Sequence, residues 1–343
     1  MEQTTEAAEL LEKARRELAK RIVGQAEMID GLLMALIAGG HILLEGVPGL
    51  AKTRAVKALA EITGLHFKRI QFTPDLLPAD LTGTLVWEQG AGIFKIRRGP
   101  VFANVILADE INRAPAKVQS ALLEAMEEGQ VTIGDETLAL PNPFFVLATQ
   151  NPIEHEGTYA LPEAQLDRFL MKLIVPYPSL DEEVKVLDFV SGAVAPLALS
   201  GGRAGREKTP PLKTVLDEPA LMSLRAAADV IHVDEQIARY MVSLAAASRP
   251  PAARPGDTAG KAGREGPYRY ISFGASPRAS LALYRCARIR ALFDGRSFVS
   301  PADVKDAALP VLRHRIVLSY EAEAEGLNPD TVISRILAYV PAP

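Results

Sequence analysis

Residues 46–53, with the sequence Gly-Val-Pro-Gly-Leu-Ala-Lys-Thr, combine the flexibility of glycine with a lysine and a hydroxyl group. They follow the apolar run 41–45 and precede a helix-like run, 54–62. In a strand, glycine loop and helix arranged in this order, backbone N–H groups and the helix N-terminus can bind phosphates. We therefore expect the Lys52 ammonium to reach the β- and γ-phosphates of a nucleotide and the Thr53 hydroxyl to bind Mg²⁺.

The loop departs from its strict pattern at one position. The residue before the lysine is Ala51, where that pattern has glycine, but alanine tolerates a right-handed backbone, and Gly46 and Gly49 still supply the tight turn. The alternative is a chance Gly-Pro turn before a helix. The candidates for nucleotide binding are Val23, Gly24, Gln25, Gly46, Val47, Pro48, Gly49, Leu50, Ala51, Lys52, Thr53, Arg54 and Arg278.

Two adjacent carboxylates, Asp109 and Glu110, end an apolar run further along the chain. Uncompensated charge at the end of a buried strand is costly, so the pair indicates a chemical role. Asp109 is expected to hold Mg²⁺, directly or through water, and Glu110 to polarise an attacking water. A helix N-cap role for Asp109 is the alternative, and it leaves Glu110 unexplained. A phosphate loop followed by such a pair makes up two halves of a nucleotide site.

Asn151 follows the next apolar run, 144–149, and its amide could hold the same water or the γ-phosphate. On its own, Asn-Pro is an ordinary turn signal. Its place after the first two motifs favours the functional interpretation. Arg113, shortly after the acidic pair, is a weaker candidate for a subunit interface.

Two arginines are further candidates. Arg168, in the short helical stretch 161–169, is expected on the far side of the sheet from the phosphates, where it would reach a neighbouring subunit's site. An ion pair with Asp167 is the alternative. Arg278 follows the capping pair Ser276-Pro277 and opens a helix. Because a cation in the first turn opposes the helix dipole, an anionic ligand for Arg278 is favoured.

The 343 residues are too many for one ordinary core and suggest two domains. Apolar runs alternate with helix-like runs, which predicts an α/β core with a parallel five-stranded sheet and helices on both faces. The expected strands are residues 41–45, 66–70, 101–108, 144–149 and 171–175. Two β-hairpins, near 84–97 and 130–140, interrupt this alternation, because β-favouring runs there flank a glycine-containing turn.

The stretch Pro176-Tyr177-Pro178-Ser179 ends the sheet region and is the best domain boundary. It divides the chain into a nucleotide-binding core, 1–177, and an α-helical domain, 178–343. Helices are expected at residues 181–194, 218–230, 234–248, 276–293 and 301–312. The Gly-, Pro-, Ala- and Arg-rich stretches near 200–211 and 249–267 have no apolar period and are predicted to be flexible loops.

The composition narrows the class of protein. A net charge of −4 and a pI of about 5.9 disfavour a protein whose main partner is nucleic acid. The single cysteine, Cys286, excludes an internal disulfide and a cysteine-rich zinc site. No run approaches the roughly 18 apolar residues that span a bilayer, and the first residues lack the pattern of a signal peptide. We therefore expect a cytoplasmic protein without a membrane span.

Four segments together resemble the MoxR family of AAA+ ATPases: residues 45–53, 108–115, 148–152 and 163–169. The resemblance covers nearly the whole chain, and Ala51 is usual in that family. It implies an AAA+ P-loop core with a small all-helical lid, in which the hairpins near 84–97 and 130–140 are the helix-2 and pre-sensor-1 inserts. It also implies that Asn151 is sensor 1, Arg168 a trans arginine finger and Arg278 sensor 2, acting in cis or in trans.

The resemblance further implies ATP and Mg²⁺ as cofactors, ATP hydrolysis, and a homo-oligomeric ring, expected to be a hexamer. Its members act like chaperones on client proteins, commonly with a partner that carries a von Willebrand factor A (VWA) domain. Three alternatives remain: a nucleic-acid motor, a chelatase-type motor subunit, and a nucleotide switch without hydrolysis. Trp87, Phe94 and Lys95 in the first hairpin suit a nucleic-acid motor, whereas the acidic turn Asp135-Glu136 of the second does not. A pure switch would need neither the water-polarising glutamate nor the arginine finger.

Overall fold

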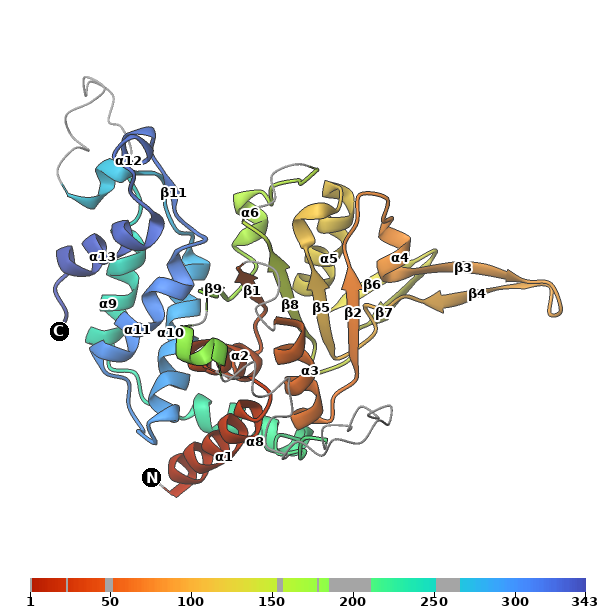
Figure 1. Ribbon diagram of the computed structural model, residues 1–343, viewed down its shortest axis with the longest axis horizontal. Helices are drawn as coiled ribbons and strands as arrows, with labels where there is room; N and C mark the ends of the chain where they lie inside the picture. Colours follow the sequence, from red (N-terminus) through yellow and green to blue (C-terminus); the bar gives the residue numbers. More distant parts are fainter. Residues whose placement is uncertain are drawn as a thin grey trace, which may run out of the picture.

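Five apolar runs of the sequence form one parallel sheet at the centre of the core (Figure 1). The computed structural model describes residues 2–22, 24–46, 52–152, 157–177, 179–184, 211–250 and 266–343. The strand order is β2-β5-β8-β1-β9. The strands are β1 (Ile42–Glu45), β2 (Phe67–Gln71), β5 (Val105–Asp109), β8 (Phe145–Gln150) and β9 (Met171–Ile174). The predicted five-stranded parallel sheet is confirmed, although β5 is shorter than the predicted run, because residues 101–104 form a turn.

Helices cover both faces of this sheet. They are α1 (Glu2–Ala19), α2 (Ala26–Ile37), α3 (Lys52–Thr63), α4 (Pro78–Thr82), the 3₁₀ helix η1 (Ile111–Arg113), α5 (Ala116–Glu128) and α6 (Glu163–Leu166). Side chains of β1 alternate between two apolar cores: Ile42 and Leu44 pack with residues of α1, α2 and α3, and Leu43 packs with residues of α4 and α5. Burial on both faces explains why the strands read as uninterrupted apolar runs.

Two hairpins leave the layered core, as predicted. Their strands are β3 (Gly83–Glu88) with β4 (Ile93–Arg98), and β6 (Gln130–Ile133) with β7 (Glu136–Ala139). The β3–β4 hairpin projects away from the sheet at the right of Figure 1. Near its tip Trp87 and Phe94 pack edge to face, with ring centroids 5.0 Å apart, and both side chains are exposed. Leu85 of β3 lies against Gly134 in the turn of the second hairpin, so the two inserts are in contact.

The C-terminal part is mainly helical. Its elements are α8 (Glu218–Asp229), α9 (Glu235–Ala246), η2 (Pro267–Tyr270), β10 (Ile271–Phe273), α10 (Pro277–Phe293), α11 (Pro301–Leu312), β11 (Val317–Leu318), α12 (Tyr320–Ala324) and α13 (Pro329–Tyr339). The helical lid is confirmed with one addition, a short antiparallel β10–β11 pair that the sequence does not predict. Most of the helix expected at 181–194 and most of the loops predicted at 200–211 and 249–267 lie outside the described residues. Within the described ranges, no helix combines the length and apolarity needed to cross a membrane.

The lid is fastened to the core just before β9. His314 and Arg315, which follow α11, both contact the carbonyl oxygen of Phe169, at 3.1 Å from His314 Nε2 and 2.6 Å from Arg315 Nη2. The Arg315 side chain is 2% exposed and pairs with Asp167 at 2.8 Å. Burial lowers the pKa of Arg315, and the Asp167 carboxylate opposes that shift. This segment before β9 is therefore fixed from the sheet side and from the lid side.

Candidate functional site

The two carboxylates predicted to act on a nucleotide lie at the carboxyl end of β5. Asp109 ends the strand, and Glu110 follows it with a φ of 57°, the only positive φ outside glycine in the described residues. A backbone of this kind is strained and persists where surrounding contacts hold it. Here the Glu110 N–H donates to the Thr149 hydroxyl at 2.8 Å, and that hydroxyl donates to Asp109 Oδ1 at 2.7 Å. Thr149, on β8, thus holds both acidic residues.

Side chains from β2 and η1 hold the same carboxylates from another side. Arg69 donates from Nε and Nη2 to Asp109 Oδ2 at 3.0 and 2.6 Å. Gln71 donates to Glu110 Oε2 at 2.9 Å, and Arg113 Nε lies 3.0 Å from the same oxygen. Asp109 does not cap a helix, so the N-cap alternative is wrong. Sequence patterns single out neither Arg69 nor Gln71; their only signal is that they end the strand next to β5.

Lys52 and Asn151 lie at the ends of the neighbouring strands. The Lys52 ammonium, at the start of α3, donates to the Gly46 carbonyl oxygen directly after β1. Burial lowers the pKa of Lys52, and the carboxylates of Asp109 and Glu110 oppose the shift. Asn151 directly follows β8 and is 5% exposed. The structure therefore gathers these residues at the carboxyl ends of β1, β5 and β8, the edge at which ligands bind in open α/β sheets.

The nucleotide loop itself is described only at its two ends. Val47, Pro48, Gly49, Leu50 and Ala51 lie outside the described residues, as does Val23. Thr53 and Arg54 lie in the first turn of α3, next to Lys52. Mg²⁺ in nucleotide sites takes one or two protein oxygens together with phosphates and waters. The hydroxyl of Thr53 and the carboxylate of Asp109 are donors of that kind, so these residues fit the metal.

A cavity of about 670 Å³ opens beside Gly24 and Gln25, between the end of β9 and α11. Gly24 has a φ of 78°, a backbone conformation that favours glycine, and the Glu182 carboxylate lies against the place that a Cβ would take. The Gln25 side-chain oxygen is buried and accepts no hydrogen bond from the described residues. A buried acceptor at a cavity wall suits an N–H donor of a ligand, such as the exocyclic amine of a purine.

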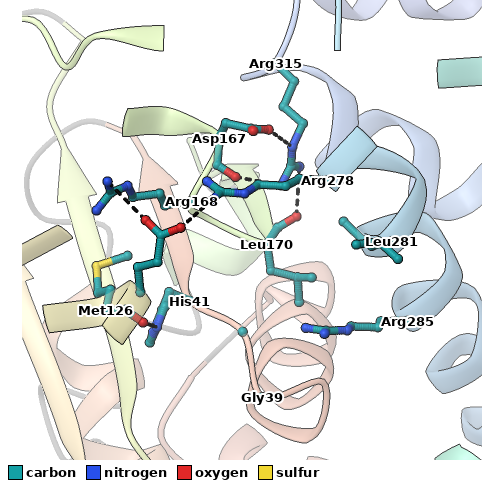
Figure 2. Close-up of a pocket in the computed structure, with 13 residues that line it drawn as sticks. Gly39, His41, Met126, Asp167, Arg168, Leu170, Arg278, Leu281, Arg285 and Arg315 are labelled. Carbon is teal, nitrogen blue, oxygen red and sulfur yellow. Dashed lines mark hydrogen bonds and ion pairs between the residues drawn. The ribbon is translucent and has the colours of Figure 1, made fainter. Parts of the chain in front are cut away.

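Arg168 and Arg278 lie at the opposite, amino end of the sheet (Figure 2). The Leu170 N–H donates to the His41 carbonyl oxygen at 2.8 Å, which places the segment before β9 beside the residue before β1. Parallel β1 and β9 start together at Ile42 and Met171. Because β1 has four residues, its two ends lie about 10–13 Å apart. Both arginines therefore stand at the other end of the strand from the nucleotide loop.

The ion-pair partner of Arg168 differs from the one that the structural alternative predicted. Helix α6 ends at Leu166, and Asp167 pairs with Arg315, so the Arg168–Asp167 ion pair is wrong. Arg168 pairs instead with Glu127, and so does Arg278.

Ser276 caps α10 as expected, since its hydroxyl accepts from the Arg278 N–H at 3.0 Å. The same hydroxyl donates to Asp167 at 2.7 Å. The first turn of α10, including Arg278, is therefore tied to the segment before β9.

Comparison with known proteins agrees with this architecture. The family profile "ATPase family associated with various cellular activities (AAA)" matches residues 41–171, and the profile "AAA lid domain" matches residues 268–336. A crystal structure of a candidate ATPase from Cytophaga hutchinsonii superposes with a TM-score of 0.86 at 45% identity, over 100% of this chain and 97% of that one.

Similarity to curated proteins extends over almost the full length. The chain is 46% identical to the chaperone MoxR1 of Mycobacterium tuberculosis, over 97% of this chain and 82% of that protein. It is 41% identical to the protein YeaC of Bacillus subtilis, over 97% of this chain and 95% of that protein. The protein MoxR of Methylorubrum extorquens is 33% identical, over 96% and 94% of the two chains.

Proposed function

The chain belongs to the MoxR family of AAA+ ATPases, and from that premise we propose that it hydrolyses ATP in a homo-oligomeric ring and remodels client proteins. The observation that carries the proposal is the division of the functional residues between the two ends of the sheet. The phosphate-binding lysine and the acidic pair stand at one end, and two arginines stand at the other. A site divided in this way is completed by a second copy of the chain.

The residues at the carboxyl ends would bind ATP and prepare the water. Lys52 is expected to bind the β- and γ-phosphates, with the loop 46–51 around them. Glu110 would accept a proton from the attacking water, which Asn151 holds in line. Mg²⁺, held by Thr53 and Asp109, would neutralise phosphate charge when bound. The cavity beside Gly24 and Gln25 is the expected place of the adenine base.

The residues at the amino ends would act on the next subunit. An arginine stabilises the negative charge that develops on the transferred phosphoryl group. Arg168 is held at the amino end of the sheet, so its own nucleotide is out of its reach. Arg278 stands beside it, which supports a trans role for both arginines. A head-to-tail interface of this kind forms a closed ring when its rotation allows. From the likeness to the MoxR family, we expect six subunits.

The client-facing surface is expected on the projecting β3–β4 hairpin. Trp87 and Phe94 at its tip are exposed, and such aromatic side chains suit contact with other chains. By likeness to the chaperone MoxR1, the client is a protein in assembly or activation. We also propose that the protein acts in the cytoplasm, together with a partner that carries a VWA domain.

A nucleic-acid motor is the second candidate, because the same hairpin carries Lys95, Arg97 and Arg98 near its aromatic side chains. Lys95, however, forms an ion pair with Glu88, which lowers its availability to phosphates. Stimulation of the ATPase by DNA that disappears at high salt would favour this candidate. We expect no such stimulation.

Replacing Glu110 with glutamine tests ATP hydrolysis. The amide keeps the size and hydrogen bonds of the side chain but cannot take a proton, so we expect turnover to fall about a hundredfold or more. ATP affinity, measured by fluorescence titration, should stay within about threefold, because phosphate contacts are unchanged. Glu124→Gln, an exposed change on α5, is the control. Turnover of Glu110→Gln equal to that of the unmodified protein would remove Glu110 from the mechanism.

A further inference from the structure

A cavity of about 290 Å³ at the amino end of the sheet gathers six charged side chains (Figure 2). Its walls come from the residues before β1, the end of α5, the segment before β9 and α10. The charged residues that line it are Glu127, Asp167, Arg168, Arg278, Arg285 and Arg315. The cavity has four arginines and two carboxylates. Which arginines the carboxylates pair with therefore determines which arginines keep an uncompensated positive charge.

The two carboxylates of the cavity have different partners. Asp167 accepts from the buried Arg315 at 2.8 Å and from the Ser276 hydroxyl at 2.7 Å, and so joins the lid to the core. Glu127 also contacts the lid, but through a more exposed ion pair: the Arg278 and Glu127 side chains are 47% and 35% exposed, against 2% and 17% for Arg315 and Asp167. The Glu127 carboxylate pairs with the two arginines that we expect to face the next subunit.

Glu127 is shared between Arg168 of the core and Arg278 of the lid. Its Oε2 lies 3.0 Å from Arg168 Nη2, and its Oε1 accepts from Arg278 Nη2. One carboxylate oxygen is therefore bound to each guanidinium group, so Glu127 bridges the two arginines. Two guanidinium groups repel each other at short range, and a carboxylate between them offsets this repulsion and fixes their separation.

The helix that carries Glu127 does not favour a carboxylate at this position. Glu127 lies in the last turn of α5, which ends at Gly129 with a φ of 63°. A negative charge there opposes the helix dipole. The preceding turn supplies a second anchor, because Arg168 Nη1 donates to the Leu123 carbonyl oxygen at 2.7 Å. The ion pairs with the two arginines, and not the helix dipole, therefore stabilise the Glu127 carboxylate at this position.

We propose that Glu127 is a positioning residue for hydrolysis in the neighbouring subunit: it holds Arg168 and Arg278 side by side at the spacing that the neighbour's phosphates require. This inference rests on the proposed function, in which both arginines act in trans. A guanidinium has five N–H donors, so each arginine keeps donors for phosphate while Glu127 holds it. Because the ion pairs of Glu127 within the described part of the chain are with these two arginines, its loss should lower the rate of hydrolysis and leave ATP binding in its own subunit intact.

Glu127→Gln and Glu128→Gln form a matched pair. Glu128 is adjacent and exposed, and no hydrogen bond or ion pair of its side chain occurs among the described residues. We expect Glu127→Gln to lower kcat on the order of tenfold, with KM for ATP, melting temperature and ring size unchanged. Glu128→Gln should match the unmodified protein. An unchanged kcat overturns the proposal. A raised kcat also overturns it, because it would show that Glu127 inhibits the two arginines.

Mixed rings locate the effect in one subunit. Arg168→Ala subunits keep their nucleotide site, and Lys52→Ala subunits keep their arginines. Activity therefore arises at interfaces where a Lys52→Ala subunit supplies its arginines to the nucleotide site of an Arg168→Ala subunit. Adding Glu127→Gln to the Lys52→Ala subunit should lower this activity about tenfold, whereas adding it to the Arg168→Ala subunit should have little effect. Equal losses in both arrangements would overturn the positioning role. Failure of the parent mixture to recover activity would instead contradict the trans arginines of the proposed function.

Discussion

Thr149 shows how much of the site depends on single side chains. It is buried on β8, and its hydroxyl joins the backbone of Glu110 to the carboxylate of Asp109. The positive φ of Glu110 leaves that N–H without a helical or sheet partner. The hydroxyl satisfies the N–H and at the same time aims the acidic pair at the ends of the neighbouring strands.

Replacing Thr149 with valine tests this arrangement. Valine keeps the shape but removes the hydroxyl, so a buried N–H and a carboxylate oxygen lose a partner, at a cost of about 1–3 kcal/mol. We expect a lower urea midpoint and about tenfold slower ATP turnover, while Thr149→Ser should retain most of both. Equal stability and activity of the valine and serine variants would contradict the role of the hydroxyl.

His41 gives the fold a dependence on pH. The ring accepts from the Val146 N–H at 3.1 Å and contacts the Met126 carbonyl oxygen at 3.1 Å. Burial lowers the pKa of His41 from 6.5 to about 4, so the folded state favours the neutral ring. Its contribution to stability is complete above about pH 6.5 and is lost as the pH falls toward 4.

The free energy of unfolding should therefore drop by on the order of 3 kcal/mol over that pH range because of His41 alone. Urea titrations of the unmodified protein and of His41→Gln, at several pH values, measure this difference. The gap between the two proteins should narrow as the pH falls from 6.5 to 4. A gap that stays constant with pH would contradict a neutral buried His41.

Local patterns predicted only part of the site. Lys52 was predicted from the glycine loop before it, and Asp109 and Asn151 because each ends or follows an apolar run. The structure puts all three at one edge of the sheet. Thr149 and Arg69 were not predicted, because each acts through a partner 40 residues away along the chain. Such contacts exist only once β2, β5 and β8 are paired.

At the scale of elements, α11 and the residues after it set the position of the lid. Arg315 and Asp167 form a pair that is almost out of water, whereas Arg239 and Glu235 on α9 form a pair that is largely exposed. Breaking the first leaves a poorly solvated carboxylate without its guanidinium. Breaking the second changes little, because exposed ion pairs contribute little.

Arg315→Met should therefore lower the free energy of unfolding by about 3–5 kcal/mol, and Arg239→Met by less than about 0.5 kcal/mol. Urea unfolding at neutral pH compares the two variants. Since Arg315 also holds the segment that carries Arg168, its loss should reduce ATP turnover as well. Similar urea midpoints for the two variants would contradict the claim that the Arg315–Asp167 ion pair stabilises the contact between the lid and the core.

Elements differ in how far the sequence reveals them. The sheet strands and both hairpins were predicted, because continuous apolar runs and glycine turns are strong local signals. The β10–β11 pair was not, because its strands have three and two residues and lie more than forty residues apart. The short helix α4 likewise has too few residues to show an apolar period.

At the scale of the whole molecule, the candidate functional residues form two groups at opposite ends of the sheet. The carboxyl ends of the strands hold Lys52 and the acidic pair, and the amino ends hold Arg168 and Arg278. In the ring that we propose, each subunit would offer its nucleotide site to one neighbour and its arginines to the other. One apolar core continues from the sheet through α2 into α8 and α10.

Mixed rings of Lys52→Ala and Arg168→Ala subunits test this division most directly. Each variant alone should hydrolyse ATP at least about a hundredfold more slowly than the unmodified protein. An equal mixture should recover up to about a quarter of normal turnover, because a quarter of randomly formed interfaces pair an intact nucleotide site with intact arginines. Turnover of the mixture that stays at the level of the separate variants, at every ratio, would contradict a site shared between subunits.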